Sequence, residues 1–159
     1  MKYFINKKEK TSGFSLMEVL VVLGVLALVV SIVFSGFNSF SKTKSVGSDA
    51  ETIVEILRQA RNETIASKNS SAYGVHFSGN TMTIFVGPTY SAGAATNRVI
   101  SLPSNNTSLT LSLTGGVSYV LFAKISGETN QNGTITVSSS GVTGTKTVTI
   151  YKTGIVEMN

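Results

Sequence analysis

Glu18 is the only ionisable side chain in the 24-residue run from Phe14 to Phe37. A carboxylate in so apolar a run is costly in a membrane or a protein core unless a cation pairs with it. The chemistry open to Glu18 is therefore ion pairing, and the run itself contains no Lys or Arg. The sequence thus raises the question of which group pairs with this carboxylate.

The remaining residues offer little for catalysis or metal binding. His76 is the only histidine, and in its expected strand it is predicted to be a solvated or hydrogen-bonded structural residue. Asp49 is the only aspartate and Glu128 is isolated, so no paired-carboxylate site or calcium loop is predicted. Cysteine is absent, which excludes disulfides and thiolate metal sites. We expect no enzyme activity, no metal and no cofactor.

The run from Phe14 to Phe37 is long enough to cross a bilayer, because a helix of this length extends about 36 Å. A secretory signal has a shorter apolar region that ends at a small-residue cleavage site, and "SGFNSFSKTK" contains none. A plain single-pass anchor fits the length but leaves Glu18 without a role. Neither alternative accounts for the charge.

The residues around Gly13 support a third interpretation. A short basic leader is followed by Gly13, Phe14 and Glu18, the fifth residue counted from Phe14. The stretch "KTSGFSLMEVLVVLGVLALV" resembles the class III signal of type IV pilins and of type II secretion pseudopilins. The resemblance implies a membrane prepilin peptidase that cuts after Gly13 and N-methylates Phe14. It also implies that Glu18 pairs with the Phe14 amine of another subunit during assembly; the alternative is that Glu18 reaches the lipid headgroups.

Residues 38–70 are expected to form an amphipathic helix. Its apolar stripe recurs at steps of three and four residues, and consists of Val46, Ala50, Ile53, Val54, Leu57, Ala60 and Ile65. Asp49 is placed off this stripe with the other charged residues. Ser48 with Glu51 fits a capping box, and the alternative is one continuous helix from the membrane segment, bent near Gly47. The stripe is expected to dock on a β-sheet.

Residues 71–159 change to a period of two and predict a β-rich globular domain. "AYGVHF" and "TMTIFV", joined by "SGN", predict a hairpin. Six further strand candidates are "RVISL", "SLTLSL", "VSYVLF", "GTITVS", "TVTIY" and "GIVE". No helix of useful length is expected after Lys68. The predicted fold class is α+β, with the order of a pilin-like fold: a long N-terminal helix, half membrane and half amphipathic, packed on a C-terminal antiparallel β-sheet domain.

The C-terminal half resembles the H-type pseudopilins and FimT-like minor pilins. The stretches that carry this resemblance are "RQARNETIASKNSSAYGVHFSGNTMTIFVG" and "GTITVSSSGVTGTKTVTIYKTGIVE". The segments expected from both resemblances are a leader peptide (1–13), a transmembrane and filament-core helix (14–37), an amphipathic helix (38–70) and the β domain (71–159).

The resemblance implies a minor pilin or pseudopilin, a structural subunit of a type II secretion pseudopilus or a type IV pilus. Its expected partners are prepilin peptidase, other pilins or pseudopilins, and membrane lipid before assembly. It would cross the cytoplasmic membrane once, with its C-terminal domain outside the cytoplasm, and then enter the filament. The alternative is a pilus-tip subunit that binds DNA or an adhesion ligand. Nucleic acid has weak support, because residues 1–13 carry three of the five net positive charges.

Overall fold

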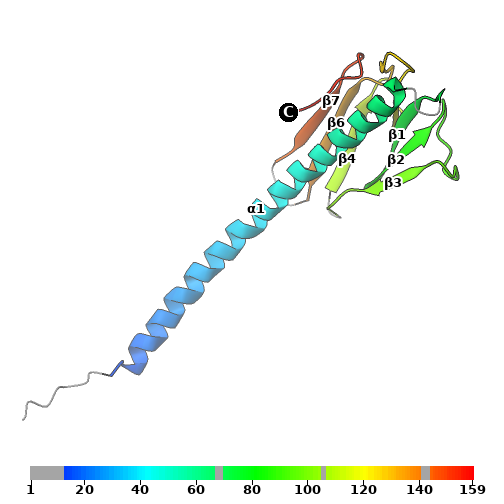
Figure 1. Ribbon diagram of the computed structural model, residues 1–159. Coiled ribbons are helices and arrows are strands. Elements are labelled where there is room, and N and C mark those ends of the chain that lie inside the picture. Colours follow the sequence, from blue (N-terminus) through cyan, green and yellow to red (C-terminus); the bar gives the residue numbers. More distant parts are fainter. Residues whose placement is uncertain (1–12, 67–69, 105–106, 141–143) are drawn as a thin grey trace, which may run out of the picture. The chain divides into compact units, whose positions relative to one another are not determined.

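The computed structural model describes residues 13–66, 70–104, 107–140 and 144–159, without the side chains of 35–39 and 42. The chain divides into two compact units, Met1–Asn38 and Ser39–Asn159. Helix α1 (Leu16–Ile65) contributes to both units (Figure 1). Of the predicted leader, Gly13 alone lies within the described residues. We call Ser39–Asn159 the globular unit.

Helix α1 is continuous through Ser48, so the alternative of a single helix is confirmed and a helix start at Ser48 is wrong. The Ser48 carbonyl instead accepts a hydrogen bond from Thr52 Oγ1 at 2.8 Å, inside the helix. The helix ends at Ile65, short of the predicted 70, and residues 67–69 lie outside the described part of the chain.

Eight strands follow the helix in the described residues, and they correspond to the predicted hairpin and the six further strand candidates. They are β1 (Tyr73–Ser78), β2 (Thr81–Val86), β3 (Arg98–Ser101), β4 (Thr107–Leu113), β5 (Tyr119–Leu121), β6 (Gly133–Ser139), β7 (Lys146–Ile150) and β8 (Val156–Met158). They form two four-stranded sheets with the orders β3-β2-β1-β5 and β4-β6-β7-β8. Every pairing is antiparallel. No further α-helix occurs among the described residues after 70.

The predicted hairpin is confirmed as β1 and β2, which pair in register from Tyr73↔Val86 to Ser78↔Thr81. Gly79 in its turn has a φ of 55°, a conformation that glycine adopts at little cost. This turn chemistry was readable from "SGN", because glycine and asparagine favour the tight turns that join antiparallel strands.

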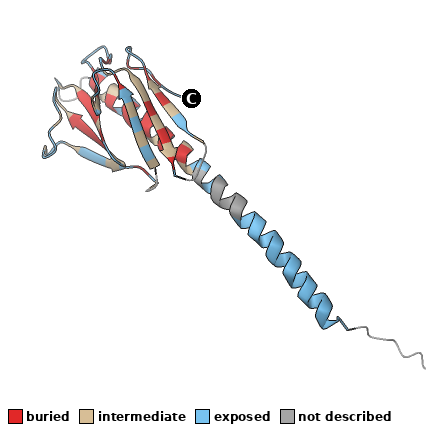
Figure 2. Ribbon diagram, turned by 180° about the vertical axis from the view of Figure 1, so that it is seen from behind, coloured by how far each residue is buried: buried red, intermediate tan, exposed pale blue. Residues whose placement is uncertain are grey.

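The hydrophobic core lies wholly within the globular unit. It joins the α1 stripe to one face of each sheet, and its largest fully buried members include Ile53, Leu57, Met82, Phe122 and Ile135. Figure 2 shows this buried stripe where α1 covers the strands. The buried residues of α1 differ from the predicted stripe at two positions. Ile56, which the prediction left out, is buried, and Ile65, which it included, remains 39% exposed at the helix end. The α+β, pilin-like fold class is confirmed.

Candidate functional site

The N-terminal residues Gly13, Phe14 and Ser15 precede the first turn of α1. Phe14 is 82% exposed, and nothing within the described chain covers its ring. Ser15 caps the helix: its Oγ accepts a hydrogen bond from the Met17 N–H at 3.3 Å, and its carbonyl accepts one from the Glu18 N–H at 3.0 Å. Side-chain oxygens at this position satisfy amides that the helix itself leaves without partners.

Glu18 stands three residues after this cap, in the first turn of α1. The spacing Ser-x-x-Glu is that of a capping box, and a carboxylate at the start of a helix is favoured by the positive end of the helix dipole. Sequence reasoning missed this local role, although the signal was present in "SLME". Glu18 is therefore suited to the helix start before any partner is considered.

The stretch Leu16–Phe34 is apolar and exposed along its whole length. It is the one candidate membrane span among the described residues, with a mean hydropathy of 2.9 over 19 residues and none of its window buried within the chain. Burial of a large apolar side chain gains about 1.5–3 kcal/mol. Covering this surface with lipid or with other helices would therefore be favourable.

The burial of Asp49 contradicts the sequence prediction, which placed this residue off the apolar stripe with the other charged residues of α1; Asp49 is fully buried. Its Oδ1 accepts a hydrogen bond from the Ser104 N–H at 3.2 Å, and its Oδ2 accepts one from the Thr107 hydroxyl. Asn80 Nδ2 donates to the Ser104 carbonyl at 2.8 Å and extends the network. These contacts attach the segment between β3 and β4 to the helix. Their partners lie more than 50 residues from Asp49, so no local pattern could reveal them.

Two arginines near the C-terminal end of α1 donate hydrogen bonds to main-chain carbonyls of the globular unit. Arg61 Nε donates to the Gly127 carbonyl at 3.2 Å and Arg61 Nη2 to the Thr153 carbonyl at 3.4 Å. Arg58 Nη2 donates to the Val156 carbonyl of β8 at 3.0 Å. Both guanidinium groups are thus used as structural donors to main-chain oxygens, which leaves them poorly placed to bind phosphate.

His76 belongs to a cluster on the outer face of the first sheet. Its ring stacks on Tyr90 with centroids 3.9 Å apart, and its Nε2 lies 3.3 Å from the Ser118 hydroxyl. Partial burial lowers the pKa of His76 below its usual range. Phe85 packs edge-on against Tyr90 and crosses Gly74, where a Cβ would stand 2.4 Å from the Phe85 ring. The predicted structural role of His76 agrees with these contacts.

Metal-binding geometry is lacking in the part of the chain that the structure describes, where no three His, Cys, Asp or Glu side chains converge. The features that stand out are thus the capped N-terminal segment, the exposed apolar run and the surfaces of the globular unit. All three suit packing and assembly.

Two family models match the chain. The one described as Type II transport protein GspH matches residues 49–154, from Asp49 to the turn between β7 and β8. The one described as Prokaryotic N-terminal methylation motif matches residues 9–34, which include Gly13, Phe14, Glu18 and most of the apolar run. No curated protein and no solved structure gives a match.

Proposed function

Because the chain belongs to the GspH family of type II transport proteins and carries the N-terminal methylation motif, we propose that it is a membrane precursor that matures into a minor subunit of a type II secretion pseudopilus. Pilin and pseudopilin families are structural subunits rather than enzymes, so its function is assembly. A type IV pilus would use the same segments in the same way. The observation that carries the proposal is the exposed apolar stretch Leu16–Phe34 directly after Gly13 and Phe14.

Processing removes the leader by a cut between Gly13 and Phe14, and Phe14 then receives the methyl group. Gly13 has open space around its Cα, since a Cβ placed there would meet nothing within 4 Å. The described residues thus leave room for a peptidase on this side of the backbone. The cut also retains Ser15, so the hydrogen bond from Met17 and the helix start survive maturation.

Assembly begins from the lipid-embedded helix, with the globular unit outside the cytoplasm. The basic leader, held at the cytoplasmic surface by Lys7, Lys8 and Lys10, sets this orientation. In the filament, helices of neighbouring subunits replace lipid around the apolar run. The exchange needs no polar rearrangement except at Glu18.

The new Phe14 amine gives Glu18 its partner in a neighbouring subunit. A cationic amine beside the first turn of α1 is unfavourable, because it faces the positive end of the helix dipole. A neighbour's Glu18 carboxylate neutralises it, and in a low-dielectric helix bundle an unpaired charge of either sign is costly. The pairing therefore favours one axial register between subunits.

Mass spectrometry of the mature protein, isolated from cells with and without prepilin peptidase, tests the proposal. We expect a chain that begins at Phe14 and bears one N-methyl group, and an uncut chain when the peptidase is absent. Gly13→Leu should block the cut, whereas Gly24→Ala, a matched change at a helix glycine with equally open surroundings, should not. An intact Met1 in cells with the peptidase, or a cut near residue 40, would refute the proposal.

A further inference from the structure

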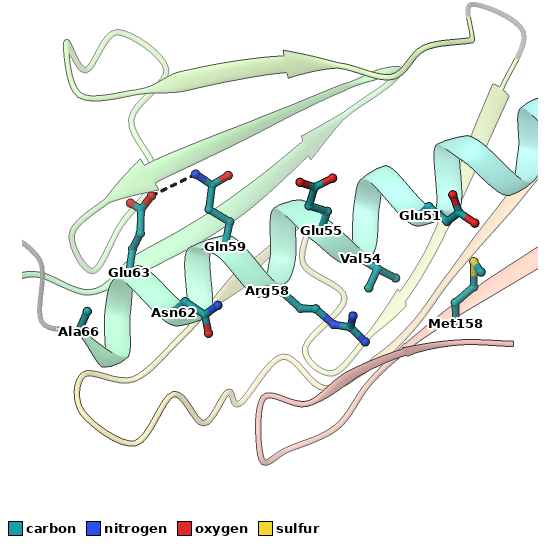
Figure 3. Close-up of a pocket in the computed structure, with 9 residues that line it drawn as sticks. All are labelled: Glu51, Val54, Glu55, Arg58, Gln59, Asn62, Glu63, Ala66 and Met158. Carbon is teal, nitrogen blue, oxygen red and sulfur yellow. Dashed lines mark hydrogen bonds between the residues drawn. The ribbon is translucent and has the colours of Figure 1, made fainter.

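A groove of about 1070 Å³ runs along the solvent-facing side of α1 in the globular unit. Seven residues of α1 between Glu51 and Glu63 line it, together with Ala66 just past the helix end and Met158 of β8. Figure 3 shows Glu55, Gln59 and Glu63 on one side of the helix, and Val54 and Arg58 on the side toward Met158. The groove is thus bounded by a helix face and by the edge strand of the second sheet.

The groove is negatively charged. Of its three carboxylates, Glu63 pairs with Arg98 at 2.6 Å and accepts a hydrogen bond from Gln59 at 3.2 Å. Glu51 and Glu55 are exposed, and no described Lys or Arg side chain forms an ion pair with either. Arg58, the one basic residue of the lining, donates to the Val156 carbonyl. Two carboxylates are therefore available to a basic partner.

Met158 of β8 lines the same groove as these two carboxylates, on the side of α1 that Arg58 faces. Thr147 and Asn159 exchange main-chain hydrogen bonds at 3.1 and 2.8 Å, and the Tyr151 N–H donates to the Ile155 carbonyl. In an antiparallel pair, the residues that alternate with such bonded positions point their main-chain groups to the other side. Val156 and Met158 therefore direct theirs away from β7. Arg58 occupies the Val156 carbonyl, and no described residue bonds to the Met158 main chain. The main-chain groups of Met158 therefore remain open to an added strand, whereas the Val156 carbonyl is already bonded to Arg58.

The spacing of the two carboxylates matches such a strand. Glu51 and Glu55 are one helical turn apart, which separates their Cβ atoms by about 5–6 Å. Residues two apart in a strand face the same way and lie about 6.7 Å apart. A strand added next to β8 directs alternate side chains to the face of the sheet that α1 covers. Basic residues at two such positions would meet Glu51 and Glu55.

We propose that this groove binds an extended segment of another protein that carries Lys or Arg at two positions separated by one residue. A second copy of this chain does not supply it in this way. None of the four basic residues in 70–159 are two apart, and the pairs with this spacing, Lys8 with Lys10 and Lys42 with Lys44, belong to the proposed leader and to helix α1. Binding in this groove depends neither on the N-terminal segment nor on its processing or pairing. All residues that line the groove belong to the globular unit.

Two peptides of equal composition and charge test the proposal on the full chain in uncharged detergent micelles. Acetyl-TVKVKVT-amide places its lysines on one face of a strand, and acetyl-TVKKVVT-amide places them on opposite faces. Because the chain has no cysteine, Asn62→Cys provides a single site in the groove for an environment-sensitive fluorophore. Titration into the millimolar range then reports occupancy.

We expect saturable binding of the first peptide, about two- to five-fold tighter than binding of the second, the range of one exposed ion pair. Glu51→Gln with Glu55→Gln should abolish this preference, whereas Glu128→Gln, an exposed carboxylate outside the groove, should preserve it. Equal binding of both peptides, a preference that survives the double substitution, or no saturable signal would overturn the proposal. A further outcome is a fluorescence that rises with protein concentration in the absence of peptide. If the double variant loses that rise, the groove binds a second copy of the chain, and the proposal is overturned as well.

Discussion

Substitution of Asp49 should destabilise the globular unit through its hydrogen bonds. Asp49→Ala leaves the Ser104 N–H and the Thr107 hydroxyl without their acceptor. A buried donor without a partner costs about 1–3 kcal/mol. Both donors belong to partly buried residues, so we expect a total loss of about 2–4 kcal/mol in the free energy of unfolding.

Asp49→Asn separates hydrogen bonding from charge. The amide keeps an oxygen for the Ser104 N–H, and its NH₂ faces the Thr107 hydroxyl, which can rotate to accept. We therefore expect Asn to cost less than about 1 kcal/mol. Thr52→Ala, which removes a hydrogen bond on the exposed side of the same helix, is the matched control and should cost at most about 0.5 kcal/mol.

Thermal and urea unfolding of Ser39–Asn159, followed by circular dichroism, provides the assay, because this unit contains the whole buried core. Its 121 residues imply an unfolding entropy of about 0.25 kcal/mol/K, so Asp49→Ala should lower Tm by about 8–16 °C. A loss below about 1 kcal/mol for Ala would refute the network as a stabilising element. Equal losses for Asn and Ala would show that the charge, rather than the hydrogen bonds, is what the fold requires.

Three further predictions concern packing, pH and assembly. Gly74→Ala should cost about 1–3 kcal/mol of unfolding free energy because its Cβ would overlap the Phe85 ring, whereas Gly93→Ala, in open space, should be neutral in the same urea titration. The lowered pKa of His76 means that the unfolded chain binds a proton more readily, so unfolding free energy should fall as pH drops below about 6.5; a fall of the same size in His76→Phe would contradict this cause. Glu18→Gln keeps the capping spacing but removes the charge, so it should leave processing intact and reduce the amount of subunit in sheared filaments; normal incorporation would contradict the pairing account.

The contacts of Asp49 explain why sequence reasoning misplaced it. Its spacing from the apolar stripe is that of a residue at the margin, where a charged side chain is normally solvated. Burial became possible only because Ser104, after β3, and Thr107, at the start of β4, supply donors. The same holds for the arginine contacts, whose acceptors are main-chain oxygens 66 to 98 residues away, in loops and in β8.

The amino-acid sequence by itself determined the features that depend on near neighbours. The apolar run after Gly13, its single carboxylate and the cap at Ser15 follow from residues a few positions apart, as do the α1 stripe and the β1–β2 hairpin. Helical periodicity and turn chemistry act over this range, so they can be recognised without a fold.

Only the tertiary structure decided which strands became neighbours and which surfaces remained open. Alternation along a strand tells which side chains face the core, but several short Thr- and Ser-rich strands have the same pattern, so it cannot select their partners. The strand order β4-β6-β7-β8 leaves β8 at an edge, and Arg58 places that edge beside the helix. The groove with Glu51 and Glu55 exists for this reason: residues 100 positions apart meet there because the sheet and the helix share one core.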